Sequence, residues 1–399
     1  MISYETSQNM ISLLSIGTTR RERLFISNAL GRVLAEDIIA QEDYPTHPTS
    51  AMDGYAVIHA DFAEYDVLAI LGDNPAGASE IESVENGICI KTFTGSLMPK
   101  GSDTLIPIEN VSVKEEEILI EKTVPLGFAV RPVGESYRQG EILISRGTTI
   151  GFAEIGVLAG INRVMIWVAQ RPRVSILATG SEILDIGEVQ RHAGQIRSSN
   201  SYTLEALVNQ LGGESIGMGI IGDDKNAIME RFEEALRSSD IVISTGGVSV
   251  GDYDFVKHIV PKLGAEVIFK GVNIKPGQHV MVAQRGSKFI ISLPGFAYSS
   301  TVTFILYVAP LIARILGGIN PYEPIEATLK VPFAKRSNKS EFTACNLTFL
   351  DGRYWVDFEG KKTGSSAILT NLLGNAALMI CGEDDGDLEE GTLVRVIKL

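Results

Sequence analysis

Apolar residues in the middle of the chain form short uninterrupted runs, most of which end in glycine. This pattern is typical of strands that are buried on both faces of a sheet. The runs are VSILATG at 174–180, SIGMGIIG at 215–222, DIVISTGG at 240–247, AEVIFKGV at 265–272 and KFIISLPG at 288–295. Because strands of this kind alternate with helical segments, they predict a mostly parallel sheet built from β-α-β units.

Two segments between these runs carry apolar residues at the spacing of one helix face. The first set is Leu204, Leu207, Val208 and Leu211, and the second is Ile228, Phe232, Ala235 and Leu236. Ser199 or Asn200 is expected to cap the start of the first helix, and Gly212 with Gly213 to end it. Ligands of such sheets bind where the strands end, and the polar and glycine-rich motifs of this chain fall there.

The regions on either side have a different pattern. Residues 4–16 predict a short helix, and pieces such as GICIKTF and EEILIEKTV predict strands broken by Gly and Pro. The tail alternates polar and apolar residues without a strong helix, which indicates a small β-barrel-like domain. We expect an α/β multidomain protein with an elongated N-terminal domain (1–54 and 132–170), a β-rich insert (55–131), an α/β domain (171–320) and a C-terminal β domain (321–399).

The most apolar stretch, Phe304 to Ala313, contains Pro310 and soon meets Arg314. We interpret it as a buried helix that is too short to span a bilayer. The start of the chain lacks a basic segment followed by an apolar core, and the three cysteines show no zinc-site spacing. We therefore expect a cytoplasmic protein with ordinary thiols and no membrane association.

The formal net charge is −14, with 45% hydrophobic and 21% charged residues. Such a surface repels a nucleic-acid backbone, so polynucleotide binding is not expected. A small anionic ligand remains compatible with this charge, because one local pocket can reverse the global sign.

The loop STGGVSVGDYD, residues 244–254, follows a predicted buried strand. Its glycines allow close backbone approach and expose N–H groups, which suits a phosphate or another oxyanion. Asp252 and Asp254 add carboxylates, the groups that commonly hold magnesium against phosphate oxygens. A tight turn with solvated acids is the alternative for this loop taken alone.

Further motifs occur in order along the chain. They are PTSAMDGYAV (48–57), FTGSLMPKGSDTLIPIE (93–109), RPVGE (131–135), LATGSEI (177–183), SSN (198–200), GDD (222–224), KPG (275–277), SLPG (292–295) and TGSS (363–366). Together with the glycine-rich loop they resemble the molybdopterin molybdenumtransferases, the MoeA family, to which the C-terminal part of gephyrin also belongs. The resemblance spans nearly the whole chain and implies a MogA-like molybdopterin-binding α/β domain.

The resemblance implies that the protein inserts molybdate into adenylylated molybdopterin and releases AMP with the help of a divalent cation, Mg²⁺. It also implies a homodimer, and as partners molybdopterin adenylyltransferase, other cofactor-biosynthesis proteins and acceptor molybdoenzymes. Catalytic roles are implied for Asp53, Thr94, Glu182, Asp223, Asp254 and Lys275, with Asp223 and Asp254 at the metal. Substrate binding is implied for Thr179, Gly180, Asn200, Ser244, Gly246, Gly247, Ser249, Gly251, Pro294, Gly295, Arg131 and Ser365.

Several of these residues have a purely structural alternative. Asp223 would serve equally as a turn residue or a helix N-cap before Lys225, and Asp53 as part of an Asp-Gly turn. Thr94 would cap a strand end, and Ser365 would belong to a serine-rich turn.

For Arg131, Glu135 and Lys275, the chemistry of the side chains also suggests a role. Arg131 and Glu135 would form a salt bridge at a domain junction as readily as part of the reaction site. For Lys275, which the following Pro-Gly turn would fix, we expect neutralisation of molybdate or phosphate.

The chain departs from the family pattern at a few positions of the inferred cleft. Ser136 and Ser198 replace acids of the usual RxxGED and DSN motifs, and Phe296 with Ala297 replaces the Asn and second Pro of LPGNPVS. Gln278 stands where a lysine commonly follows KPG. These changes keep a non-catalytic pterin-binding or scaffold paralogue open as an alternative, and the related adenylyltransferase is a second one.

Overall fold

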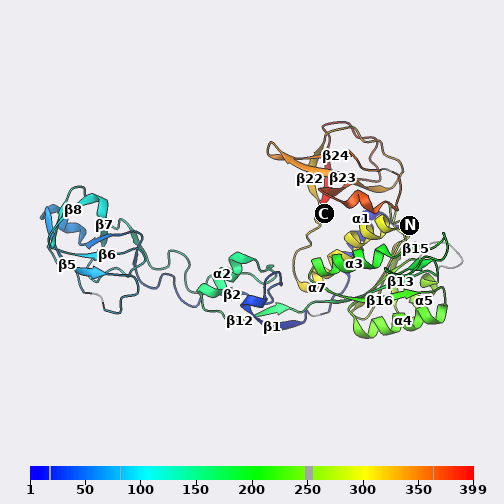
Figure 1. Ribbon diagram of the computed structural model, residues 1–399, viewed down its shortest axis with the longest axis horizontal. Helices are drawn as coiled ribbons and strands as arrows, with labels where there is room; N and C mark the ends of the chain where they lie inside the picture. Colours follow the sequence, from blue (N-terminus) through cyan, green and yellow to red (C-terminus); the bar gives the residue numbers. More distant parts are fainter. Residues whose placement is uncertain (18, 81, 248–254, 363) are drawn as a thin grey trace. The chain divides into compact units, whose positions relative to one another are not determined.

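The computed structural model describes residues 1–17, 19–80, 82–247, 255–362 and 364–399. The chain divides into two compact units (Figure 1). One unit combines residues Met1–Glu36 with Arg146–Leu399, and the other is Asp37–Ser145. Each is described by itself.

The first unit is built around a six-stranded sheet of order β16-β13-β17-β21-β20-β18. Its strands are β13 (Arg173–Thr179), β16 (Glu214–Ile221), β17 (Ile241–Thr245), β18 (Glu266–Lys270), β20 (Met281–Arg285) and β21 (Lys288–Leu293). The first four strands of that order run parallel, and β20 and β18 add antiparallel pairings at one edge. The prediction of a mostly parallel sheet is confirmed, and β20 is a strand that the sequence pattern did not indicate.

Helices cover both faces of this sheet (Figure 1). Ile241 and Ile243 pack with α3 (Ser199–Gln210) and the helix over residues 297–316, whereas Val242 packs with α4 (Lys225–Ser238) and α5 (Val256–Lys262). Alternate side chains of one strand thus reach opposite layers, which requires the uninterrupted apolar runs seen in the sequence.

The cap predictions need two corrections. The N-cap of α3 is Ser198 rather than Ser199 or Asn200, and its hydroxyl pairs with Ser201 Oγ at 2.8 Å instead of a backbone N–H. Helix α4 is capped by Asp224, whose side chain accepts from Ala227 N at 2.8 Å. Asp223 is therefore not the helix N-cap.

The apolar stretch around Phe304 is longer than the sequence pattern suggested. A continuous helix of 20 residues, Ala297–Leu316, comprises α6 (Ala297–Thr303), the π-helical turn η4 (Phe304–Val308) and α7 (Ala309–Leu316). It is long and apolar enough to cross a membrane, so the prediction that it is too short was wrong, but 83% of its apolar 18-residue window is buried inside the protein. The burial supports its interpretation as a core helix.

Pro310 explains the wider turn in this helix. Proline has no N–H to donate to the carbonyl four residues earlier, and its ring crowds that carbonyl. The carbonyl of Leu306 accepts instead from Gln8 Nε2 at 3.1 Å. Tyr307 also reaches the N-terminal helix α1 (Tyr4–Leu13), pairing with Ser7 Oγ at 2.9 Å.

The tail of the chain forms a closed five-stranded barrel, as predicted. Its strands are β22 (Ile325–Leu329), β23 (Ser340–Leu350), β24 (Arg353–Asp357), β25 (Ala376–Cys381) and β26 (Leu393–Lys398), with the turn η5 (Leu369–Leu372). The pairing of β23 with β25 closes the order β23-β24-β22-β26-β25. A short strand of the α/β domain, β19 (Ile274–Lys275), joins this sheet parallel to β23.

The first unit has further elements. They are β1 (Arg21–Phe25), η1 (Ile26–Asn28), α2 (Phe152–Gly160), β12 (Met165–Ala169), β14 (Ile183–Leu184) and β15 (Ile196–Arg197). Strands β1 and β12 pair antiparallel, and β14 and β15 pair parallel.

The second unit is β-rich, with a mixed sheet of order β7-β4-β6-β5-β9-β8. Its elements are β2 (Ile38–Ile39), β3 (Thr49–Ser50), β4 (Gly54–Val57), η2 (His59–Ala63), β5 (Val67–Asn74), β6 (Ile88–Thr92), β7 (Thr104–Pro107), η3 (Ile108–Asn110), β8 (Val111–Lys114), β9 (Glu117–Ile120), β10 (Val130–Arg131) and β11 (Ile142–Ile144). Its core contains Cys89; burial raises the pKa of this thiol, and of the buried Cys345 in the barrel, to about 12.

Candidate active site

The carboxyl ends of β13, β17 and β21 meet at one edge of the parallel sheet. Gly246 N donates to Leu293 O at 3.2 Å, and a β-carbon on Gly246 would lie 2.8 Å from Thr179 O. A β-carbon on Gly295 would lie 3.8 Å from the Gly246 α-carbon. The structure therefore brings Thr179, Gly246 and Gly295 together, although their motifs are far apart in the sequence.

Glycine is required at the β17 end of this edge. Gly246 and Gly247 have φ values of +88° and +69°, and a β-carbon on Gly247 would lie 2.9 Å from Val256 Cγ2. Side chains are thus excluded both by backbone conformation and by space. The rest of the glycine-rich loop, with Ser249, Gly251, Asp252 and Asp254, lies outside the described residues.

Two of the predicted hydroxyls at this edge are engaged within the protein. Ser244 is fully buried and donates to Ser292 Oγ at 3.0 Å, and Thr179 donates to Thr245 O at 3.2 Å. These bonds tie neighbouring strands together just before the loops begin. Asn200, predicted with them, donates to Gly295 O at 2.8 Å and so connects α3 to the loop after β21.

The acidic residues of this edge belong to two adjoining loops. Asp223 Oδ2 accepts from Ser181 N at 3.2 Å, and Ser181 Oγ accepts from Asp223 N at 3.1 Å. The Glu182 carboxylate lies against Gly180, where a β-carbon would be 2.7 Å from Oε2. Both carboxylates are exposed.

This donor set suits a cation shared with a ligand rather than one held by the protein alone. Among the described residues no three His, Cys, Asp or Glu side chains are grouped to hold a metal. Magnesium, however, commonly uses one or two carboxylates together with substrate phosphates. Asp223 and Glu182 fit that requirement.

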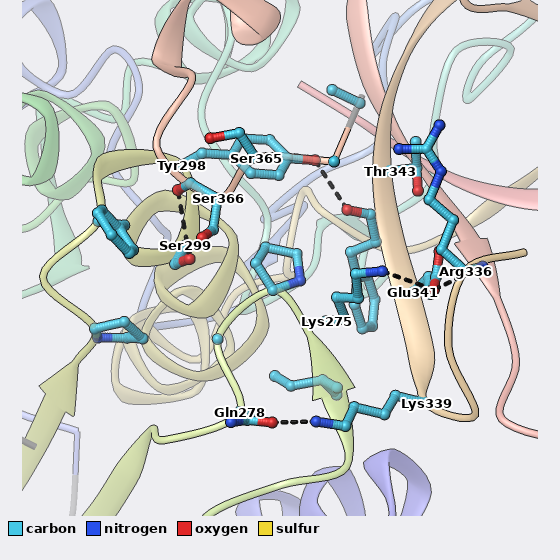
Figure 2. A pocket seen from close by; sticks show the side chains of 18 of the residues that line it. Lys275, Gln278, Tyr298, Ser299, Arg336, Lys339, Glu341, Thr343, Ser365 and Ser366 are labelled. Atoms are coloured by element: carbon cyan, nitrogen blue, oxygen red, sulfur yellow. Dashed lines mark hydrogen bonds and ion pairs between the residues drawn. The ribbon is translucent and has the colours of Figure 1, made fainter. Parts of the chain in front are cut away.

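A pocket of about 410 Å³ lies where the α/β domain meets the barrel (Figure 2). The α/β domain contributes the turn after β19 and the loop between β21 and α6, and the barrel contributes the segments before and within β23 and the loop after residue 361. The predicted residues Lys275, Pro294 and Ser365 all line it. Three motifs that are far apart in the sequence are thus joined in one cavity.

Hydrogen bonds hold the two sides of this pocket together. Tyr298 of α6 donates to Phe342 O of β23 at 2.9 Å, and Ser299 N donates to Ser366 O at 3.2 Å. Asn371 bonds the backbone of Lys362 through both its oxygen and its nitrogen, at 2.9 and 2.6 Å. These contacts fix the loop that carries Ser365.

Cationic side chains outnumber acidic ones in the described part of the pocket lining. Lys275 was predicted, whereas Arg336, Lys339 and Lys362 of the barrel were missed. Nothing in their sequence context marks these three residues, because the barrel strands bring them to the cavity. Lys275 Nζ lies 3.3 Å from Glu341 Oε1, and 40% of the lysine side chain is exposed.

The departures from the family pattern have clear positions. Gln278, which stands where the family commonly has a lysine, lines the pocket and accepts a hydrogen bond from Lys339 Nζ. A lysine of the barrel therefore lies next to the position of the lysine that this chain lacks. Phe296 also lines the pocket and is 62% exposed. Ser198, in contrast, is buried at the start of α3.

The remaining predicted residues lie in the second unit. Asp53 Oδ1 accepts from Thr94 N at 2.8 Å and from Thr94 Oγ1 at 2.7 Å. The backbone bond first, and then the hydroxyl bond, lower the pKa of the Asp53 carboxyl below its ordinary value.

Arg131 and Glu135 form an ion pair at 2.5 Å, and Arg131 Nη2 donates to Ser136 Oγ at 3.4 Å. Arg131 belongs to β10, which pairs with β3 of the same unit. The predicted salt bridge is therefore present, within one unit of the chain.

Comparisons with known proteins cover the whole chain. Residues 2–161 match the family model of the MoeA N-terminal region (domain I and II), 175–314 that of the probable molybdopterin binding domain, and 326–399 that of the MoeA C-terminal region (domain IV). A molybdopterin molybdenumtransferase of Nostoc sp. is 34% identical over 93% of this chain and 87% of its own. One from Haemophilus influenzae is 31% identical over 75% of this chain and 74% of its own.

Solved structures give the same result. The crystal structure of a molybdopterin biosynthesis MoeA protein from Pyrococcus horikoshii is similar with a TM-score of 0.86 and 28% identity, and each chain is covered completely.

Proposed function

Because the chain belongs to the MoeA family of molybdopterin molybdenumtransferases, we propose that it inserts molybdate into adenylylated molybdopterin and releases AMP. The protein is a transferase of molybdenum cofactor biosynthesis. The adenylylated form of the substrate, the cation and the roles of individual residues are parts of this proposal.

The observation that carries the proposal is the cationic pocket. A chain with a net charge of −14 gathers Lys275, Arg336, Lys339 and Lys362 around one cavity. Ammonium and guanidinium groups are the side chains that bind oxyanions. We assign molybdate to this pocket, with Lys275 and the Ser365 hydroxyl as its contacts.

The adjoining sheet edge suits the phosphates of the pterin nucleotide. Gly246 and Gly247 are half-buried and Gly295 is exposed, so part of this edge remains open to a ligand. Backbone N–H groups in a glycine-rich turn bind phosphate oxygens. In this assignment Pro294 lies between the phosphate and molybdate positions, because it lines the pocket and directly precedes Gly295.

Magnesium, when bound, would screen the negative charge that develops as the pyrophosphate bond to AMP breaks. Asp223 and Glu182 would hold it, with Asp254 as a further candidate from the family pattern. The chain's own residues would orient the substrate and hold molybdate near the dithiolene group of the pterin. Holding the two reactants close together in this way accelerates their reaction. From the family pattern we also assign a catalytic role to Asp53, whose charged form is favoured by the hydrogen bonds from Thr94.

We also infer a homodimer in the cytoplasm, with molybdopterin adenylyltransferase and acceptor molybdoenzymes as partners. Helix α2 supports the dimer. Its sequence FAEIGVLAG is largely apolar, yet within it only Leu158 is buried, and Phe152 is 91% exposed. An apolar helix face of this kind is typical of a subunit interface.

The test is an AMP-release assay with adenylylated molybdopterin, magnesium and the purified protein, with and without molybdate. The proposal requires AMP release and active cofactor when molybdate is present. Pterin binding without any AMP release would support a non-catalytic paralogue instead. Consumption of ATP with bare molybdopterin would point to an adenylyltransferase.

The Lys275→Ala variant tests whether Lys275 contacts molybdate. Loss of one charge-assisted contact to the anion should raise the KM for molybdate about 10- to 100-fold. Lys330→Ala is matched to it, because Lys330 pairs with Asp357 at 3.9 Å on the same barrel but outside the pocket lining. If Lys275→Ala and Lys330→Ala have the same KM, molybdate has been placed wrongly.

A further inference from the structure

Glu341 is a buried carboxylate in the wall of the cationic pocket. Only 3% of the residue is exposed. Its Oε1 accepts from Lys275 Nζ at 3.3 Å and from the backbone N of Arg336 at 3.1 Å (Figure 2). It also accepts from Ser337 Oγ at 2.7 Å. A buried charge needs such partners, and here one of them is the lysine assigned to the substrate.

The side chains of Lys275 and Glu341 differ in how tightly the protein holds them. Parallel pairing of β19 with β23 sets Lys275 and Glu341 opposite each other in the sheet. The Glu341 side chain is 4% exposed and anchored by two further donors, whereas 40% of the Lys275 side chain is exposed. Their separation of 3.3 Å is longer than the roughly 2.7–2.9 Å of a strong charge-assisted hydrogen bond. The lysine is therefore the partner that can leave.

The charge of Glu341 is opposite to that of the cationic side chains in the pocket lining. Within the described part of the lining it is the one acidic residue, against Lys275, Arg336, Lys339 and Lys362. An entering oxyanion is attracted by these four cations and repelled by Glu341. It must also compete with Glu341 for the Lys275 ammonium.

We propose that Glu341 is a positioning residue that serves as the internal counter-ion of Lys275. It holds the Lys275 ammonium at the wall of the pocket, and the entering oxyanion replaces Glu341 as the partner of that ammonium. This inference rests on the proposed function, because molybdate is the oxyanion assigned to the pocket. Glu341 lowers the affinity for any oxyanion that it must displace, and so favours those that engage the barrel cations as well as Lys275.

Replacement of Glu341 by glutamine tests this role. Glu341→Gln removes the charge but keeps an oxygen that can accept from Ser337 and from the Arg336 backbone. Calorimetric titration of the full chain with molybdate, and separately with sulfate, should show both anions binding about five- to tenfold more tightly. The KM for molybdate should fall to a similar extent, while kcat changes by less than about twofold.

Asp357→Asn is the matched control. Asp357 lies on the same barrel, in β24, forms an ion pair with Lys330 and is outside the pocket lining. The loss of the same charge there should leave the anion dissociation constants within about twofold of wild type. If Glu341→Gln does not fold, Glu341→Asp serves instead, since it withdraws the carboxylate from Lys275 by one methylene group and should tighten binding about twofold.

A double-mutant cycle separates the counter-ion role from general repulsion. In a Lys275→Ala background, Glu341→Gln should improve anion binding less than half as much as in wild type. Equal or weaker binding by folded Glu341→Gln overturns the inference, and so does full additivity with Lys275→Ala. A wild-type chain that binds neither molybdate nor sulfate overturns the proposed function as well, whereas a chain that binds both and releases AMP leaves it intact.

Discussion

Asp53 is hydrogen-bonded to Thr94, and these bonds change the pKa of its carboxyl group. Two hydrogen bonds from Thr94 favour the charged form of the carboxyl, which lowers its pKa. Asp53 therefore stays ionised as the pH falls through the ordinary carboxyl range, and it becomes protonated only below its lowered pKa. Any activity or stability that depends on its charge persists to that lower pH and is lost beneath it.

Thr94→Val should move this titration. The loss of the hydroxyl bond raises the Asp53 pKa towards its ordinary value, and the acidic limb of the activity profile moves to higher pH with it. Carboxyl chemical shifts followed by NMR across the acid range measure the change. The Asp185 pKa, which is lowered by Tyr202 and Ile186, is the internal reference and should not move. An unchanged Asp53 titration in Thr94→Val would show that the hydroxyl bond is absent in solution.

Phe296 is the departure from the family pattern with the most direct expected effect. It lines the pocket, is 62% exposed, and stands where the family usually has asparagine. An exposed aromatic ring stacks on a flat heteroaromatic ligand such as a pterin, and stacking of this kind contributes about 1–3 kcal/mol.

Phe296→Asn should therefore raise the KM for the pterin nucleotide about 5- to 100-fold, and change the KM for molybdate little. Steady-state kinetics with each substrate varied in turn measure the two constants. Phe349→Asn is the control, since Phe349 is 63% exposed and lies outside the pocket lining. Unchanged pterin kinetics in Phe296→Asn would place the ring away from the substrate.

At this scale the sequence identified residues that belong to short local motifs. Thr179, Gly246 and Pro294 were recognisable because each follows an apolar run at a strand end. Arg336, Lys339, Lys362 and Glu341 were not, because their place in the pocket depends on strand pairing in the barrel. No local pattern encodes such a long-range contact.

The turn after β17 shows how an element depends on one residue type. Gly246 has a φ of +88°, and a β-carbon would come within 2.8 Å of Thr179 O, a backbone atom that cannot move aside easily. Gly246→Ala should lower the free energy of unfolding by about 2–4 kcal/mol, from left-handed strain and from the clash together. Chemical denaturation measures this value.

Gly286→Ala separates the two causes. Gly286 also has a positive φ, +61°, but no atom lies within 4 Å of the position that a β-carbon would take there. That variant should cost only about 1 kcal/mol. Equal destabilisation of the two variants would mean that the contact with Thr179 does not contribute.

Long apolar runs and helical periodicities predicted their elements well, and shorter or mixed patterns did not. Strand β20 was missed because its apolar part is only Met281–Ala283, followed by polar Gln284 and Arg285 before a two-residue turn. In the tail the alternating pattern indicated a β domain, but not the pairing of β23 with β25 that closes the barrel. The helix over 297–316 was predicted too short because the apolar stretch begins at Phe304, whereas its first turns, residues 297–303, are rich in Ser and Thr.

For the whole molecule, the exposed apolar face of α2 bears on assembly. Phe152 at its start is 91% exposed. Phe152→Glu should weaken a homodimer by placing a charge in an apolar interface, and the apparent mass should fall towards that of one 43.1 kDa chain. Sedimentation velocity across a range of concentrations measures this shift, with Phe349→Glu as the control. A dimer of undiminished stability in Phe152→Glu would show that α2 is not the interface.

The distribution of charge is the other property of the whole molecule that supports oxyanion binding in the pocket. A strongly acidic chain keeps four cations and one buried acid around a cavity of about 410 Å³. The net charge predicted by the sequence argues against polynucleotides as partners, but it gave no sign of this local reversal. Only the packing of the barrel against the α/β domain creates it.

The binding of molybdate in the cationic pocket is tested most directly by anomalous X-ray scattering at the molybdenum absorption edge from crystals soaked in molybdate. We expect an anomalous peak inside the pocket, within contact distance of Lys275 Nζ and near Ser365, and its loss in crystals of Lys275→Ala. A peak elsewhere with the pocket empty, in wild-type crystals whose pocket is open to solvent, would contradict it.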